Sequence, residues 1–177
     1  METVKTKKSI TKQLVLSALF TTLTMLSTFL IKIPIPLGFG YVHLGDAFVL
    51  LSAFILGPIW GTAAAGVGSA MADVFSGYAL YAPATLIIKS AMALLAWLVR
   101  HAVFKAFKKH FVAELLGGIV GAVIMPFGYF LFETVLYSAA GALVGVPWNF
   151  FQGGVGILLS VIVMRIFIAV KIFDISA

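Results

Sequence analysis

The chain has 177 residues, of which 62% are hydrophobic and 10% are charged. Soluble domains carry about 25% charged residues, so this composition excludes an ordinary soluble globule and favours a single membrane domain over residues 1–177. The formal net charge is +6, but the basic residues lie at the ends of apolar runs, which is typical of cytoplasmic membrane anchoring rather than nucleic-acid binding. The absence of cysteine excludes disulfides, thiolate catalysis and cysteine metal sites.

The first apolar run follows a cluster of N-terminal lysines, a pattern that a secretory signal peptide would share. The run from Gln13 to Ile31 is longer than a signal core of about 7–15 residues, and no small-x-small cleavage site follows it. We therefore expect an uncleaved first span.

Proline and glycine divide the remaining apolar sequence. Residues 46–74 would form a helix over about 40 Å long, against a hydrocarbon core of about 30 Å, and Gly57-Pro58 interrupts them midway. Pro126 predicts a kink in the fifth span, and the segment GALVGVPW predicts the turn before the sixth. The expected spans are, approximately, residues 12–33, 44–57, 58–75, 82–103, 112–140 and 147–172.

Charge favours six spans over five. With six, the N-terminal lysines, the basic segment Arg100–Lys109 and the tail with Arg165 and Lys171 lie on one side, which the positive-inside rule makes cytoplasmic. Fusing the second and third spans would place Arg100–Lys109 on the opposite side from the N-terminus. The sequence therefore predicts an all-α integral membrane protein with six transmembrane helices and both termini cytoplasmic, a multi-pass protein of a bacterial plasma membrane.

Two charged residues are expected about 10 Å inside the membrane from its outer surface, Lys89 on the fourth span and Glu133 on the fifth. A charge at mid-membrane costs roughly 2.5–3.5 kcal/mol on insertion scales, so such residues usually face a partner or a cavity. Lys89 and Glu133 could form a structural ion pair, or both could contact a bound solute.

Other polar residues are predicted in the same outer half. Thr85 lies one helical turn before Lys89, and Tyr129 and Tyr137 lie one turn on either side of Glu133. The tyrosines could instead be interfacial, Asp46 a helix cap and His43 a loop hydrogen-bonding residue. The predicted substrate-binding residues are Lys89, Glu133, Asn149, Tyr129, Tyr137, Thr85, Trp148, Gln152, His43 and Asp46.

Catalytic motifs are missing from the sequence. There is no GxxxxGK phosphate loop, nucleophile elbow or HExxH motif, and the three scattered histidines have no metal-ligand spacing. We expect no enzymatic activity, no metal and no cofactor.

Two stretches carry a resemblance to a known family. LGDAFVLLSAFILGPIWG at residues 44–61, and GVGSAMADVFSGY followed by APATLIIK, resemble the substrate-binding S component of an energy-coupling factor (ECF) vitamin transporter. The resemblance covers nearly the whole chain and implies a six-helix protein that captures a vitamin or precursor from outside. It places the pocket in the outer halves of spans four to six and the first loop.

The resemblance also implies partners: a transmembrane T component and two cytoplasmic ATPase subunits that supply energy for import. Many members dock the T component through an AxxxA-type motif on span one, and this chain departs from it, with Ser17/Thr21 and Ala18/Thr22 as the nearest matches. The small residues Gly61 and Ala65 complete the predicted docking set, although they could instead serve helix packing within the chain.

The substrate is predicted only by class. An aromatic pocket with one cation and one anion favours hydroxymethylpyrimidine or pyridoxine, stacked on Tyr and Trp with Glu133 and Asn149 at ring nitrogens or hydroxyls. Pantothenate would place its carboxylate on Lys89, and riboflavin would need a larger pocket. The competing hypotheses are a membrane scaffold or assembly protein without a ligand, and a small stand-alone transporter.

Overall fold

The computed structural model describes residues 9–34 and 41–171. The lysines before residue 9, the loop residues 35–40 and residue 172 of the sixth predicted span lie outside the described residues. The elements are α1 (Ile10–Leu30), β1 (Lys32–Pro34), β2 (Tyr41–His43), α2 (Gly45–Leu56), α3 (Trp60–Phe75), α4 (Ala82–Phe107), α5 (His110–Leu136) and α6 (Ala139–Val170).

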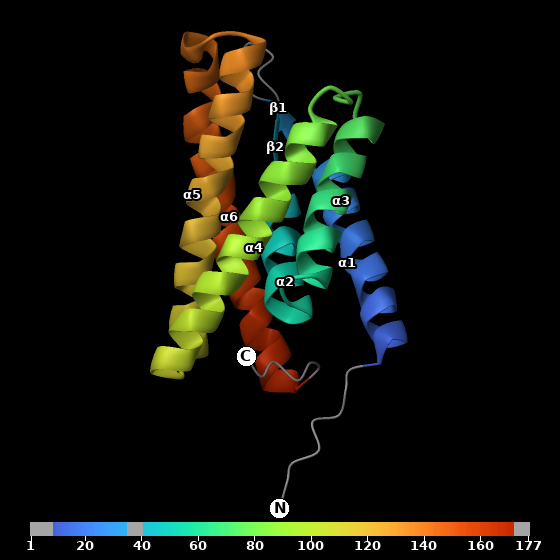
Figure 1. Cartoon of the computed structure of the whole chain (residues 1–177), viewed down its shortest axis with the longest axis vertical. Coiled ribbons are helices and arrows are strands. Elements are labelled where there is room, and N and C mark those ends of the chain that lie inside the picture. Colours follow the sequence, from blue (N-terminus) through green and yellow to red (C-terminus); the bar gives the residue numbers. More distant parts are fainter. Residues whose placement is uncertain (1–8, 35–40, 172–177) are drawn as a thin grey trace, which may run out of the picture.

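The helices run up and down in one bundle (Figure 1), with α4 packed on α3 and α5, α5 on α6, and α3 on α1. We call the end with the strands, the α3–α4 turn and the α5–α6 turn the hairpin end. The opposite end, where α1 and α5 begin and α4 and α6 end, is the basic end. Among the described residues, α1, α4, α5 and α6 are long and apolar enough to cross a membrane.

Helix α2 lies inside the bundle, in contact with α1, α3, α4 and α6. Most of its apolar residues are buried, with Val49, Leu50 and Ala53 all at 0% exposure. A helix that is hydrophobic all round is a core helix. Its short length therefore follows from its position, because a helix surrounded by protein does not need to match the thickness of the lipid.

The predicted break between the second and third helices is confirmed. Gly57 ends α2 with φ of 87°, a conformation that favours glycine, and Pro58 follows it. Across this hairpin, a Cβ on Gly61 would clash with the backbone of Ser52. Gly61 and Ala65 are both buried within the chain. These two positions pack α3 inside the protein, which agrees with the alternative of helix packing within the chain.

The predicted turn at residues 141–148 is wrong, because these residues lie within a helix. The helices that correspond to the predicted spans 112–140 and 147–172 meet at residues 137–138 instead. Helix α5 ends at Leu136, and Ser138 begins the next helix by accepting a hydrogen bond from the Gly141 backbone N–H at 3.1 Å. Pro147 then lies inside α6, as Pro126 lies inside α5. Proline is tolerated within membrane helices because neighbouring groups can satisfy the freed carbonyls.

The helical fold includes one short two-stranded sheet that the sequence did not predict. Strands β1 and β2 form a short antiparallel ladder, with Lys32 opposite His43 and Ile33 opposite Val42. The ladder satisfies backbone groups of the chain as it returns from α1 towards the buried start of α2. It thereby brings His43 into contact with the helices.

An apolar layer divides the interior of the bundle. Leu50, Met92, Ala96 and Met164 belong to one buried cluster with Phe54. Polar and charged side chains are buried on both sides of this layer, around Lys89 towards the hairpin end and around Arg100 towards the basic end. The layer separates two polar clusters with different chemistry.

Candidate functional site

The candidate site at the hairpin end begins with an ion pair between Lys89 on α4 and Asp46 in the first turn of α2, both 0% exposed. Lys89 donates to Asp46 Oδ1, and its Nζ lies 2.8 Å from the sulfur of Met125. The helix N-terminus favours the negative charge of Asp46. Lys89 therefore pairs with Asp46, and the alternative of a direct Lys89–Glu133 ion pair is wrong.

Gln152 connects this pair to α6 and to the strands. Its Nε2 donates to Asp46 Oδ2 at 2.9 Å, and its Oε1 accepts from the backbone N–H of His43 at 2.9 Å. A single amide thus holds α2, α6 and β2 together. Gln152 is 3% exposed, so these bonds are made away from solvent and their loss would leave buried groups unsatisfied.

His43 is a structural part of this network. The backbone N–H of Gly45 donates to its Nδ1 at 3.0 Å. Burial lowers the pKa of His43 to about 3, although nearby Asp46 opposes the shift, so the ring is neutral at physiological pH. A Cβ on Gly45 would clash with Thr28 and the His43 ring, so this position requires glycine. The alternative interpretation of His43 as a loop hydrogen-bonding residue agrees with these contacts.

A second polar group surrounds Glu133, which is 4% exposed. The hydroxyl of Tyr81 lies 3.5 Å from Glu133 Oε1 and donates to Tyr137 at 3.1 Å. Glu133 Oε2 has no hydrogen-bond partner. It points towards α6, where a Cβ on Gly145 would lie 3.1 Å from Oε2 and 3.7 Å from Asn149 Nδ2. The absence of a side chain at Gly145 leaves room beside the carboxylate.

Tyr129 lies between the two groups. Its hydroxyl is 3.0 Å from the Thr85 hydroxyl, and its ring centroid is 5.7 Å from Lys89 Nζ, close enough for a cation–π interaction. Thr85 is 2% exposed. Tyr129 therefore contacts the side of the ion pair, whereas Tyr81 contacts Glu133.

The structure brings most of the predicted site residues together, but they differ in role. Tyr137 is 52% exposed and lies at the rim. Trp148 is 38% exposed on α6, and none of the hydrogen bonds described above involves it. Its role as a stacking residue stays a prediction. Among the described residues, no group of three or more His, Asp or Glu side chains could hold a metal ion.

Sequence reasoning missed two contacts. Met125 contacts Lys89, but a methionine in an apolar helix gives no signal of such a role. The sequence predicted Asp46 as a site residue but did not predict its ion pair with Lys89. The available signal was an acidic residue at the start of a helix whose neighbours are nearly all apolar.

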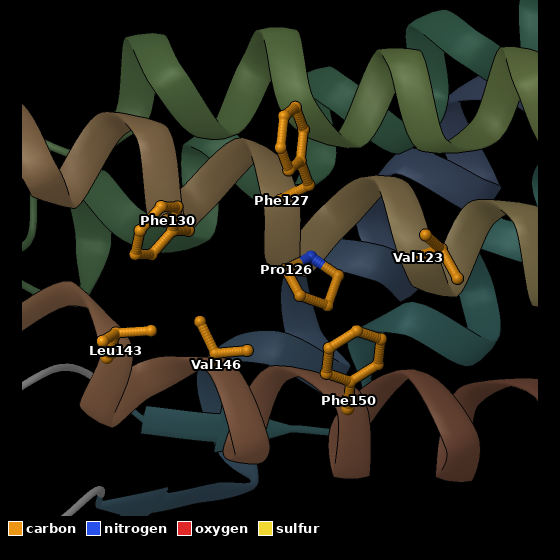
Figure 2. Close-up of a pocket in the computed structure, with 7 residues that line it drawn as sticks. All are labelled: Val123, Pro126, Phe127, Phe130, Leu143, Val146 and Phe150. Atoms are coloured by element: carbon orange, nitrogen blue, oxygen red, sulfur yellow. The ribbon is translucent and has the colours of Figure 1, made fainter. Parts of the chain in front are cut away.

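An apolar groove lies between α5 and α6, and none of the polar residues described above lines it (Figure 2). Its volume is about 270 Å³, and its lining comprises Val123, Pro126, Phe127, Phe130, Leu143, Val146 and Phe150. Phe127 and Phe150 are exposed on the outside of the bundle. A groove without polar groups cannot orient a polar vitamin, so we place the candidate site at Glu133 and not here.

On α1 the predicted docking residues divide between two faces. Ser17 is buried and Thr21 half-buried, whereas Ala18 and Thr22 are exposed. The Thr22 hydroxyl donates to the Ala18 carbonyl of its own helix at 2.9 Å, which leaves this face without an unsatisfied polar group. Ala18 and Thr22 are thus open to a partner helix.

One family model covers most of the chain. The family model for "ECF-type riboflavin transporter, S component" matches residues 8–169. The chain is 36% identical over 135 residues to the "uncharacterized protein in gap 3′ region" of Pyrococcus woesei, covering 76% of this chain and 86% of that protein. It is 27% identical over 150 residues to the thiamine precursor transporter HmpT of Lactococcus lactis subsp. cremoris, covering 84% and 83%.

A solved structure shares the fold. The S component of a bacterial ECF transporter superposes with a TM-score of 0.71 at 20% sequence identity, over 91% of this chain and 98% of that one.

Proposed function

Because the chain belongs to the family of ECF transporter S components, we propose that it captures a vitamin or vitamin precursor at the hairpin end of its bundle. A T component and two ATPase subunits would then drive import. The captured molecule would contact Glu133, with Tyr81, Tyr129, Tyr137, Thr85 and Asn149 around it.

The observation that carries this proposal is the free oxygen of Glu133. The side chain is 4% exposed, and Oε2 has no hydrogen-bond partner. A buried acceptor without a partner costs about 1–3 kcal/mol, and more when it is charged. Such a cost is tolerable where a ligand supplies the missing donor. Gly145 leaves the space in which that ligand could lie.

The charge distribution favours a ligand with donor groups over an anionic one. Lys89 is compensated by Asp46, so it has no free charge for the carboxylate of pantothenate. Glu133 would repel that carboxylate but would accept hydrogen bonds from an amino group. We therefore favour hydroxymethylpyrimidine, with pyridoxine as the related candidate. The similarity to a thiamine precursor transporter agrees with this choice, whereas the name of the family model keeps riboflavin under consideration.

The test is ligand binding by the purified chain in detergent, without ATP. We expect hydroxymethylpyrimidine to bind and pantothenate not to bind in calorimetry. Glu133→Gln should weaken binding by about a hundredfold, because a buried charge-assisted hydrogen bond is lost. Thr134→Val, at the residue that follows Glu133 on α5, is the matched control, since the Thr134 hydroxyl donates to the Phe130 carbonyl one helical turn earlier at 2.7 Å. Equal affinity in the wild type and Glu133→Gln would refute the site.

We further propose that all six helices form membrane spans, with the basic end in the cytoplasm. The cysteine-free sequence permits a direct test with single-cysteine variants. Ala79→Cys, at the α3–α4 turn, should react with an impermeant maleimide added to intact cells. Lys109→Cys, between α4 and α5, should react only after the cells are permeabilised. The reverse pattern would invert the topology.

A further inference from the structure

A second charged cluster lies at the basic end, where α4, α5 and α6 bring together Arg100, Glu114 and Arg165. Arg100 is 2% exposed and Glu114 is 0% exposed. Arg165 donates to Glu114 Oε2. Gly117 allows the close approach of α5 to α4, because a Cβ there would lie 2.5 Å from the Ala96 carbonyl oxygen and 3.1 Å from Arg100 Cβ.

This cluster has more donors than its own acceptors can satisfy. Three guanidinium nitrogens have no hydrogen-bond partner, namely Arg100 Nε, Arg100 Nη2 and Arg165 Nε. On the acceptor side, Glu114 Oε1 and the ring nitrogens Nδ1 of His101 and His110 also lack partners, and of these only the Glu114 carboxylate carries negative charge. Two arginines also face one carboxylate, so a unit of positive charge remains after Glu114 is counted. The Phe54 ring, 5.6 Å from the Arg100 guanidinium, stabilises a cation but accepts no conventional hydrogen bond.

The surroundings of the cluster increase the excess of positive charge. Lys105, Lys108 and Lys109 are exposed at the junction of α4 and α5. Among the described acidic residues, Asp46 and Glu133 belong to the site at the hairpin end and Asp73 lies near the end of α3, so Glu114 is the acidic side chain of the basic end. The field at this end therefore attracts anions.

The boundary of the cluster is apolar as well as basic. Arg165 has 38% of its side chain exposed, and its neighbour Ile166 is 52% exposed. Phe107 at the end of α4 and Phe111 at the start of α5 are 65% and 52% exposed. A phosphate group attached to acyl chains would match both features, since its charge would meet the arginines and its chains the exposed apolar residues.

We propose that Arg100 and Arg165 form a binding site for a phosphate group, supplied by an anionic lipid headgroup at the basic end. Basic pockets between membrane helices on the cytoplasmic side commonly take such headgroups. The phosphate oxygens would accept from Arg100 Nε and Nη2 and from Arg165 Nε, which a planar guanidinium can donate in parallel. The site lies across the apolar layer from Glu133 and does not depend on the identity of the vitamin.

The test uses the full chain in lipid nanodiscs of phosphatidylcholine with increasing fractions of phosphatidylglycerol. Thermal unfolding should shift to higher temperature as phosphatidylglycerol is added. In Arg100→Gln the half-maximal shift should need about fivefold more phosphatidylglycerol, as expected for the loss of one basic contact. If Arg100→Gln does not fold, Arg165→Gln provides the same test at a partly exposed position. Lys105→Gln is the matched control, because it removes the same charge from the exposed surface of α4.

A separate arm adds inorganic phosphate to nanodiscs of pure phosphatidylcholine, at constant ionic strength. Stabilisation by phosphate alone, lost in the arginine variants, would support the site with free phosphate as its source. A response to phosphatidylglycerol only would support the lipid headgroup. The proposal is overturned if Lys105→Gln loses as much as the arginine variants, or if neither anion stabilises the wild type. It is also overturned if Arg100→Gln changes the stabilisation by the anion only when the partner subunits are present.

Discussion

Removing one member of the Asp46–Lys89 pair should destabilise the protein more than removing both. Asp46→Asn leaves the Lys89 ammonium at 0% exposure with no opposite charge. Losing one partner of a buried pair costs about 3–5 kcal/mol, because the remaining charge is not compensated. The Gln152 amide also loses its carboxylate acceptor at 2.9 Å, which adds to the loss. Lys89→Met should have a similar cost, since it leaves the Asp46 carboxylate without its cation.

The double variant distinguishes this reasoning from a simple sum of two defects. Asp46→Asn with Lys89→Met contains no buried charge at this position, so we expect it to be more stable than either single variant. The coupling between the two sites should reach about 2–3 kcal/mol, within the range for residues in contact. The assay is reversible unfolding in mixed micelles, followed by tryptophan fluorescence. Additive costs in the double variant would refute the pairing of Lys89 with Asp46.

The remaining predictions concern His43 on β2, Gly45 at the start of α2, and the small residues Ala18 on α1 and Gly61 on α3. Between pH 7.5 and 5 the wild type should lose about 2 kcal/mol more unfolding free energy than His43→Gln. The reason is that the histidine of the unfolded chain takes up a proton below its ordinary pKa of 6.5, whereas the buried ring does not. Equal losses of the two proteins in thermal melts would contradict this. Gly45→Ala should greatly reduce folded yield in size-exclusion chromatography, and Thr28→Ala should restore part of it only if their clash is the cause. Ala18→Leu should leave the thermal stability of the isolated chain unchanged but reduce uptake by the assembled transporter. Gly61→Leu, in contrast, should prevent folding. Normal uptake by Ala18→Leu would exclude the exposed face of α1 as the docking surface.

The two polar clusters suggest how one small chain could serve two tasks. The cluster around Glu133 has an acceptor without a donor, and the cluster around Arg100 has donors without enough acceptors. Met92 and Met164, both 0% exposed, belong to the apolar layer that separates them. A ligand at one cluster therefore has no direct polar contact through which to affect the other, and their tests can be interpreted independently.

The sequence by itself determined the features that depend on local composition. The excess of apolar residues indicated a membrane protein, and the long apolar runs marked the helices that became α1, α4, α5 and α6. Gly57-Pro58 correctly separated α2 from α3, because a glycine at positive φ and a proline end a helix whatever surrounds it. The strings around residues 44–61 and 66–89 correctly indicated the family, which the match over residues 8–169 confirms.

Only the tertiary structure decided which polar groups meet. Lys89 and Glu133 have matching depths along their helices, but depth does not specify direction around the bundle, and the burial of α2 brought Asp46 to Lys89 instead. Likewise Gly61 is a small residue of the kind found in helix-docking surfaces, but its close approach to the Ser52 backbone shows that it packs inside the chain. Arg100 looked like part of a basic anchor, yet the close packing of Gly117 buried it beside Glu114. A charged side chain near a helix end can point either into water or into the bundle, and the packing of the neighbouring helices determines which.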